Sequence, residues 1–168
     1  MCIAGPSLSE IDLERFLSYA LSLGASYADM RYNVQHTEVI TAENGNLREY
    51  SSSIRKGLGV RVIVDGYQGY ASTSRLDSNS IKETIKKAIE SARALRSKTE
   101  KVSLAEVPTV KDKVIAPCKV NPLDVDPKDK VELLLHVNNV SLEVQDVKSS
   151  LTRMGIQRDH RIFVSSDG

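Results

Sequence analysis

The stretch that decides the fold runs from Ser51 to Ser74 and reads SSSIRKGLGVRVIVDGYQGYASTS. Val60, Val62 and Val64 alternate with Arg61 and Ile63, and such a run rich in β-branched residues is typical of a strand. Asp65-Gly66 follows, and this dipeptide favours a two-residue hairpin turn because both positions tolerate positive φ angles. Residues 67–72 supply a second arm. The stretch therefore predicts a β-hairpin.

A second hairpin is predicted immediately upstream. From Tyr27 to Thr41 the sequence alternates and is enriched in β-branched and aromatic residues. Asn44-Gly45 then gives a strong hairpin signal, and residues 47–52 form the returning arm. Gly57 and Gly59 separate this arm from the next run, and we interpret them as a bulge or bend in the sheet. Together the hairpins predict a meander of four strands.

Two helices flank this meander. The first has capping-box spacing at Ser7 and Glu10, and its apolar periodicity ends at Gly24, which favours a left-handed stop. The second is capped by Asp77 or Ser78 and carries an apolar stripe at helical intervals. We expect this stripe to lie across one face of the sheet.

The rest of the chain is less regular. Residues 96–125 contain three prolines and predict a linker with a short strand at Val114–Ala116. Asp126-Pro127 has the order favoured at a helix start, and the helix is expected to continue to about Gln145. Residues 147–164 alternate weakly and predict two strands around Arg158–His160.

These elements predict an α+β fold with a mainly antiparallel, mixed sheet of about five or six strands, packed by two or three helices. We divide the chain into a domain at 1–98 (helix, four-strand meander, helix), a linker at 99–125, and a helix with the start of a further β region at 126–168. Asp167-Gly168 is a turn dipeptide without a second arm, so we expect the natural protein to continue.

Composition excludes several functional classes. Hydrophobic residues make up 40% of the chain, and 23 basic residues balance 22 acidic ones, giving a net charge of +1. A chain with this charge balance has no overall positive electrostatic field that would attract the phosphate backbone of a nucleic acid. No apolar stretch approaches the roughly 20 residues needed to cross a bilayer, so no membrane association is expected. The two cysteines, Cys2 and Cys118, lack a CxxC partner, so a reducing cytoplasm fits best.

A search for chemistry predicts no catalytic, cofactor-binding or metal-ligating residue in this chain. His36, His136 and His160 do not form a metal-binding pair, and each is interpreted as a packed or surface residue. Gly57-Leu58-Gly59 superficially starts a dinucleotide fingerprint, but a strand follows it where a helix would be required.

Two polar clusters have structural explanations. Ser51–Ser53 could suggest a nucleophile or a phosphosite, yet no base accompanies it in the sequence. The second helix carries a basic face that is interrupted by glutamates, and we interpret it as solvated surface rather than a nucleic-acid site. The members of this face are Lys82, Lys86, Lys87, Arg93, Arg96 and Lys98.

Four segments in order resemble the N-terminal domain of the TldD/PmbA family. They are Gly24–Arg31, Glu43–Gly45, Gly57–Val62 and Gly69–Thr73. The resemblance covers most of residues 8–95 and extends more weakly through Asp126–Leu135. No single segment is specific, but their order and spacing together are.

This resemblance implies a cytoplasmic zinc metallopeptidase, of a family first described as modulators of DNA gyrase. TldD proteins work with a related PmbA (TldE) subunit and bind zinc through a His-Glu-x-x-x-His helix and a later cysteine, both in the C-terminal domain. That motif is absent from the 168 residues. Cys118 precedes the domain that carries the family's cysteine, so it is not identified as a ligand.

We therefore expect the chain to be the N-terminal, noncatalytic portion of a TldD-like peptidase, inactive alone and binding no zinc itself. It would contribute scaffold, substrate channel or subunit interface, with a strand edge that pairs with an extended peptide substrate. Expected partners are a PmbA/TldE-like subunit or a second copy. The alternatives are a binding or adaptor module from a split gene, and an interaction protein that modulates DNA gyrase.

Overall fold

The computed structural model describes residues 12–96, 99–105 and 108–167. The chain forms two compact units. Unit 1 draws on residues 1–33, 56–113 and 161–168, and unit 2 on residues 34–55 and 114–160. Each unit therefore combines segments that lie far apart in the sequence.

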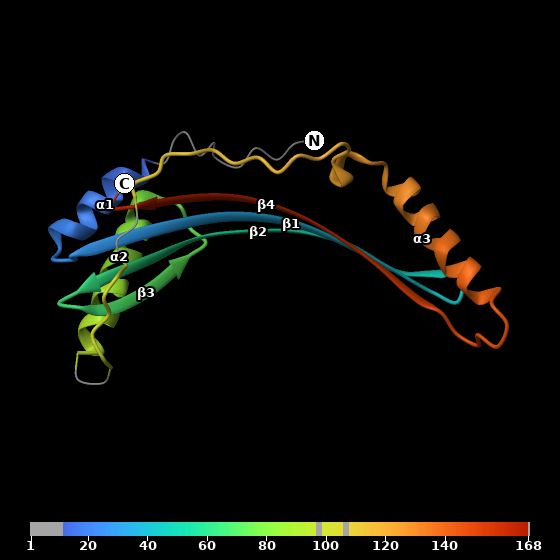
Figure 1. The fold of residues 1–168 in the computed structure, drawn as a ribbon, viewed down its shortest axis with the longest axis horizontal. Coiled ribbons are helices and arrows are strands. Elements are labelled where there is room, and N and C mark those ends of the chain that lie inside the picture. Colours follow the sequence, from blue (N-terminus) through green and yellow to red (C-terminus); the bar gives the residue numbers. More distant parts are fainter. Residues whose placement is uncertain (1–11, 97–98, 106–107, 168) are drawn as a thin grey trace. The chain divides into compact units, whose positions relative to one another are not determined.

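The elements confirm an α+β fold (Figure 1). Four strands form one sheet in the order β3-β2-β1-β4. In chain order the elements are α1 (Leu13–Ser22), β1 (Tyr27–Glu43), β2 (Asn46–Val64), β3 (Tyr67–Thr73), α2 (Ser78–Ala94), the 3-10 helix η2 (Pro122–Asp124), α3 (Pro127–Leu142) and β4 (Leu151–Ser165). No helix among the described residues is both long and apolar enough to cross a membrane.

Both predicted hairpin turns are confirmed. Asn44 and Gly45 have φ angles of 48° and 77°, and Asp65 and Gly66 have φ angles of 54° and 88°. Positive φ at both central residues is the turn geometry that matches the twist of antiparallel strands. The two turns therefore fix the β1–β2 and β2–β3 connections locally.

The prediction of four strands in the meander is wrong, because residues 46–64 form the single strand β2. β2 pairs with β3 residue by residue from Leu58↔Thr73 to Val64↔Tyr67, so Gly59 lies in a regular ladder and not in a bulge. A Cβ atom on Gly59 would lie 2.5 Å from the hydroxyl oxygen of Tyr70. This glycine makes room for an aromatic ring and does not interrupt the strand.

The C-terminal predictions need two corrections. Residues 151–165 form one strand, with no turn at Arg158–His160. Its antiparallel pairing with β1 is marked by the hydrogen bonds Asn44 N to Ser150 O (3.0 Å) and Ser166 N to Ala28 O (2.8 Å). A long neighbouring strand satisfies the backbone of polar residues that would favour a turn in isolation. Val114–Ala116 is not a strand but an exposed coil.

Unit 1 is built by α1 and α2 with the neighbouring parts of the sheet. α1 buries Leu13, Phe16, Leu17 and Ala20, and it ends before Gly24, whose φ of 97° confirms the predicted stop. The predicted cap at Ser7 lies outside the described residues, and Asp12 caps α1 instead.

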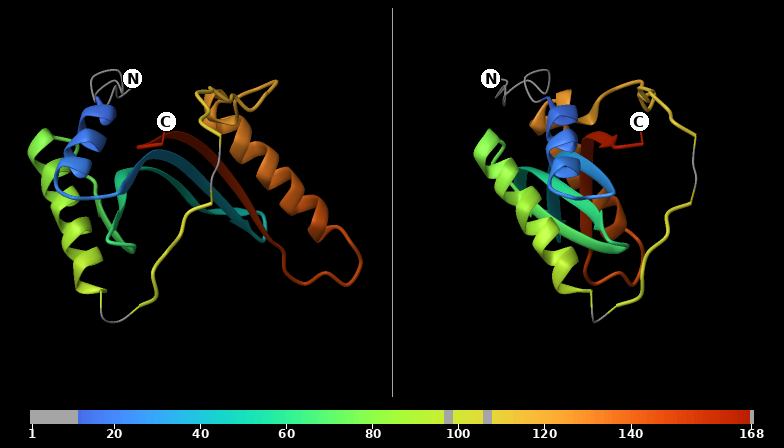
Figure 2. Two further views of the ribbon diagram at one scale, coloured as in Figure 1. Left: turned by 60° about the vertical axis from the view of Figure 1, so that its left-hand side comes forward. Right: turned by 90° about the vertical axis from the view of Figure 1, so that its left-hand side faces the viewer.

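α2 packs on β3 (Figure 2). Asp77 caps α2 by accepting a hydrogen bond from Ser80 N at 2.9 Å, as expected. A Cβ atom on Gly69 would lie 2.0 Å from Ala88 O and 2.6 Å from Ala92 N. The missing side chain therefore lets the helix backbone approach the strand directly.

Unit 2 is built by α3 on residues of β1, β2 and β4. Asp126 caps α3, Pro127 occupies its first turn as predicted, and the helix ends at Leu142, slightly before the expected Gln145. Ile40, Ala42 and Leu134 form its buried apolar cluster. Two polar side chains of α3, Lys130 and Asn138, are also buried, which the sequence did not indicate.

Candidate functional site

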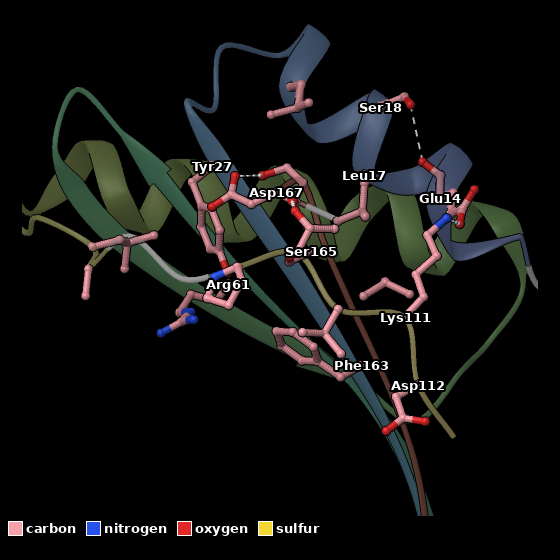
Figure 3. A pocket seen from close by; sticks show the side chains of 18 residues that line it. Glu14, Leu17, Ser18, Tyr27, Arg61, Lys111, Asp112, Phe163, Ser165 and Asp167 are labelled. Carbon is pink, nitrogen blue, oxygen red and sulfur yellow. Dashed lines mark hydrogen bonds and ion pairs between the residues drawn. The ribbon is translucent and has the colours of Figure 1, made fainter. Parts of the chain in front are cut away.

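A half-open cavity of about 860 Å³ lies in unit 1 (Figure 3). It is bounded by α1, the start of β1, the end of β2, the C-terminal end of β4 and the coil that follows α2. The residues that line it are Glu14, Leu17, Ser18, Leu21, Tyr27, Arg61, Leu104, Ala105, Pro108, Thr109, Val110, Lys111, Asp112, Phe163, Val164, Ser165, Ser166 and Asp167.

Hydrogen bonds hold the coil of the cavity wall against the sheet. Val102 N donates to Gly66 O at 2.8 Å, and Thr109 Oγ1 donates to Asp167 O at 2.7 Å. A Cβ atom on Gly66 would lie 3.1–3.3 Å from side-chain atoms of Lys101. Gly66 thus leaves room for the coil that follows α2. The sequence predicted this segment as a linker, and in the structure it forms one wall of the cavity.

An ion pair with an aromatic neighbour forms the polar side of the cavity. Arg61 Nε donates to Asp29 Oδ2 at 2.6 Å, and Asp29 is buried. The Arg61 guanidinium lies 5.7 Å from the centre of the Tyr27 ring. Burial, followed by the charge of Asp29, raises the pKa of Tyr27. Burial acts to lower the pKa of Arg61, but its hydrogen bond and attraction to Asp29 outweigh this and raise it.

The other side of the cavity is apolar with exposed charges at its rim. Leu17 and Phe163 point into it from α1 and β4 (Figure 3). Arg31 lies 5.6 Å from the Phe163 ring centre. Lys111 Nζ and Glu14 Oε1 are 4.0 Å apart, and both side chains are exposed, so this contact contributes little stability. The cavity therefore combines an apolar side, a polar side and a charged rim.

The described residues do not fit a zinc site. No group of three or more His, Cys, Asp or Glu side chains within them could hold a metal ion. The lining of the cavity contains neither histidine nor cysteine. Cys118 is exposed, and its thiol donates to Val120 O at 2.8 Å.

The three histidines occupy separate positions in unit 2. His36 lies on β1, His136 is exposed on α3, and His160 is exposed near the middle of β4. His36 Nε2 lies 3.0 Å from Ser52 Oγ. His36 comes close to Ser52 only because β1 pairs with β2, and this pairing cannot be recognised from the sequence around Ser51–Ser53.

The His36–Ser52 pair lies apart from the cavity. Ser52 is exposed on β2, and neither residue lines the cavity. Ser51 Oγ donates instead to Glu49 Oε1 at 2.8 Å. Polar pairs of this kind are a normal means of stabilising neighbouring strands.

Three members of the predicted basic face, Lys82, Arg93 and Arg96, have partners within unit 1. Arg93 Nη2 donates to Leu23 O at 3.2 Å, and Lys82 Nζ lies 5.6 Å from the Tyr19 ring centre. Arg96 forms an ion pair with Asp65. Lys98 lies outside the described residues. These contacts favour the solvated-surface interpretation over a nucleic-acid site.

One side of β2 is free along most of its length. β2 pairs with β3 from Leu58 onward, and within the described residues no strand lies beside residues 46–57 on that side. Leu47 and Ile54 are exposed there. Such an edge offers unpaired backbone groups to an extended chain.

Comparison with known proteins finds a family match and relatives whose names agree with it. Residues 28–95 match the family described as PmbA/TldA metallopeptidase domain 1. A metalloprotease of Methanocaldococcus jannaschii is 28% identical over 143 residues, covering 84% of this chain and 32% of that protein. A protein named zinc metalloprotease TldD homolog, from Saccharolobus solfataricus, is 26% identical over 151 residues, covering 89% of this chain and 30% of that protein.

Solved structures share the fold. TldE from Thermococcus kodakarensis superposes with a TM-score of 0.73 at 19% identity, covering 93% of this chain and 35% of that one. A Bacteroides thetaiotaomicron protein, named as a candidate modulator of DNA gyrase, gives a TM-score of 0.75 at 22% identity, covering 92% and 36%. The chain thus spans about a third of the length of its relatives.

Proposed function

We propose that this chain belongs to the TldD/PmbA metallopeptidase family, whose domain 1 matches residues 28–95, and that it forms the N-terminal, noncatalytic part of a zinc metallopeptidase. The observation that carries the proposal is the position of this match in the first domain of the family. The His-Glu-x-x-x-His sequence is absent from the 168 residues. The metal chemistry would belong to another part of the protein, and no reaction step is assigned to this chain.

The role that we propose for the chain is to hold an extended peptide. The free side of β2 between Asn46 and Gly57 can pair with a substrate backbone, which is a common mode of peptide recognition. Exposed Leu47 and Ile54 add apolar contacts beside this edge. A backbone-mediated contact would position different peptide sequences without strong selection of their side chains.

A PmbA/TldE-like subunit is the partner that the proposal implies, since one structural neighbour bears the name TldE. Zinc as the family's metal is implied by the name of the Saccharolobus relative. The cytoplasmic location, the domain boundaries at 98 and 125, and the gyrase and adaptor alternatives stay predictions.

The proposal is tested by comparing the 168-residue chain with the protein encoded by its whole natural reading frame. We expect the longer protein to bind one zinc ion per chain and to cleave an unstructured peptide. The 168-residue chain should do neither. Zinc content by mass spectrometry and cleavage by chromatography are the measurements. Chelator-sensitive cleavage by the 168-residue chain, or a reading frame that ends at Gly168, would overturn the proposal.

The peptide-holding role has its own test at Ser53 and Ile54. Consecutive residues of a strand direct their backbone N–H groups to opposite sides, so only one of the two faces the free edge. Ser53→Pro and Ile54→Pro are compared, and the variant with an unchanged thermal transition is taken as the edge-facing one. We expect it to lose peptide binding by the longer protein. The alanine variant at the same position should bind normally. Equal binding by the folded proline variant would contradict the role.

A further inference from the structure

In unit 1, the face of the sheet that lies away from α2 carries aromatic and arginine side chains. Gly69 of β3 faces α2, since its added Cβ would meet Ala88 and Ala92. Consecutive residues of a strand point to opposite faces, so Tyr70 points away from α2. Arg61 is the register partner of Tyr70 on β2 and therefore shares its face. We name this side of the sheet the outer face.

The strands β1 and β4 extend the outer face. Asp29 of β1 lies on it because Arg61 Nε donates to its carboxylate at 2.6 Å. Arg31, two residues further along β1, points to the same side. Its guanidinium lies 5.6 Å from the ring centre of Phe163, which places this β4 residue on the outer face as well. Arg161, two residues before Phe163, shares that side. All these residues belong to unit 1.

Two aromatic rings of the outer face are exposed, and each is supported from one side. The exposed fractions of Tyr70 and Phe163 are 61% and 51%. A Cβ atom on Gly59 would lie only 3.2 and 3.3 Å from two ring carbons of Tyr70, so this ring lies over bare backbone. The guanidinium of Arg31 supports the Phe163 ring. Both rings are thus held in place while much of their surface is open to solvent.

The charges of the outer face are mainly basic. Arg31 and Arg161 are exposed, whereas the charge of Arg61 is neutralised by the buried Asp29. Asp167 adds one exposed carboxylate, but it lies four residues from the Phe163 ring, or about 13 Å along β4. The surroundings of the two rings therefore favour an anion.

We propose that the outer face of unit 1 binds a single-stranded nucleic acid. Its bases would stack on Tyr70 and Phe163, and its phosphates would contact Arg31 and Arg161. Sheet surfaces with exposed aromatic rings bind single strands because every base has a flat π surface, and arginine matches the geometry of phosphate. The strands β3 and β4 are three strand spacings apart, or about 14 Å, so one nucleotide cannot reach both rings.

The combination of rings and arginines selects this class of ligand. Covering Gly59 explains the position of Tyr70 by itself, but it requires neither the exposed Phe163 nor the arginines. An acidic peptide would need the arginines and a neutral sugar would need the rings, whereas a nucleic acid strand uses both. The net charge of +1 provides no long-range attraction, so the affinity has to come from this face alone.

The first test measures binding to the 168-residue chain by fluorescence anisotropy at about 50 mM salt. The probes are a labelled oligothymidylate of about twelve nucleotides, an abasic strand of the same length and a polyglutamate peptide. We expect the oligothymidylate to bind at least fivefold more tightly than the other two, because only its bases can stack. No binding of the oligothymidylate, or equal affinity for the abasic strand, would overturn the proposal. Displacement of the bound strand by a neutral oligosaccharide would identify a sugar site instead.

The arginines are tested through the salt dependence. Two phosphate contacts on a single strand predict a slope of about −1.4 for the logarithm of the binding constant against that of the salt concentration. Arg31→Gln combined with Arg161→Gln should flatten this slope. Lys86→Gln combined with Lys87→Gln removes the same charge from exposed positions of α2 and should leave it unchanged. An equal effect of both double variants would show that the outer face is not the site.

The rings are tested by substitutions that keep an apolar cover. Tyr70→Leu and Phe163→Leu should each weaken binding at least fivefold, whereas Tyr70→Phe keeps the ring and should bind normally. Tyr19→Leu, on α1, is the control for loss of an aromatic side chain elsewhere in unit 1. Circular dichroism checks that each variant is folded, and the exposed arginine pair decides the outcome if a ring variant is not. Unchanged affinity of the folded leucine variants would refute stacking.

Sedimentation of the chain without ligand distinguishes a second copy as the occupant. We expect a monomer at concentrations at which the oligothymidylate binds. Self-association that is abolished by Arg31→Gln combined with Arg161→Gln would mean that a second copy covers the outer face, and the proposal would be wrong. Failure of zinc binding or of cleavage by the longer protein would leave these results unaffected, so the two proposals fail separately.

Discussion

Lys130 and Glu38 form a buried ion pair that joins α3 to β1. Lys130 Nζ donates to Glu38 Oε2 at 2.6 Å, and the side chains are only 5% and 9% exposed. The two residues are 92 positions apart in the sequence. Because desolvation of two charges is costly, the pair is better understood as fixing where α3 lies on β1 than as a large source of stability.

Removing one partner of this pair should be strongly destabilising. Lys130→Met leaves Glu38 buried without its cation, and we expect a loss of about 3–5 kcal/mol in the free energy of unfolding. The double variant Lys130→Met, Glu38→Leu should recover most of that loss. Urea unfolding measures both.

The matched control is Lys128→Met, which breaks the exposed Lys128–Glu132 pair at 3.6 Å on the same helix. It should cost less than about 0.5 kcal/mol. A similar loss for the Lys128 and Lys130 variants would show that burial does not decide the effect.

Gly69→Ala should separate α2 from β3. The new methyl group would lie 2.0 Å from Ala88 O, and a backbone atom cannot move away as a flexible side chain can. We expect a loss of about 1–3 kcal/mol, the usual range for overpacking. Gly155→Ala is the control, because no atom lies within 4 Å of its added Cβ. Thermal unfolding of both variants checks the prediction, which equal transitions would refute.

Asn138 should hold the β1–β2 turn to α3. Its amide accepts from Gly45 N at 2.7 Å and donates to Thr152 Oγ1 at 2.7 Å and Ala42 O at 3.3 Å. Asn138→Leu leaves buried polar groups without partners, so we expect a loss of about 1–3 kcal/mol.

Hydrogen exchange gives a local measurement of this role. The Gly45 amide should lose protection in Asn138→Leu and keep it in His136→Ala, at an exposed position of the same helix. Unchanged protection in the Leu variant would mean that the turn is held by its own geometry.

Alkaline pH should destabilise unit 1 through Tyr27. Its pKa is raised in the folded protein by burial and by the charge of Asp29. The unfolded chain therefore loses the phenol proton first, near pH 10. Stability from this group is complete below that pH and falls as pH rises through the folded pKa.

Tyr27→Phe removes the titrating group and should reduce the fall in stability above pH 10. Absorbance near 295 nm during a pH titration measures the phenol directly. The wild type minus Tyr27→Phe difference should titrate above pH 10, and a midpoint at or below 10 would contradict the prediction.

The cavity was beyond the reach of the sequence. Tyr27, Arg61 and Phe163 come from three strands, and the coil residues 104–105 and 108–112 belong to a segment predicted as a linker. The residues that immediately surround Tyr27, Arg61 and Phe163 in the sequence do not mark any of the three as part of a cavity. Their convergence follows from strand order, which periodicity does not contain.

Local sequence determined the turns and caps of this protein. Asn44-Gly45 and Asp65-Gly66 adopt positive φ, and Asp77 and Asp126 cap helices, because these conformations depend on a few neighbouring residues. The alternating runs likewise determined that strands would form, and so the α+β class.

Tertiary structure alone decided where strands end and which polar groups are buried. β2 continues through Gly57, and β4 through Arg158–His160, because a neighbouring strand satisfies their backbone groups. Lys130 follows Lys128 and Asp129 in a charged run that predicts solvent exposure, yet Glu38 from a distant strand allows it to be buried. Local sequence sets the conformations available to each segment, and long-range pairing selects among them.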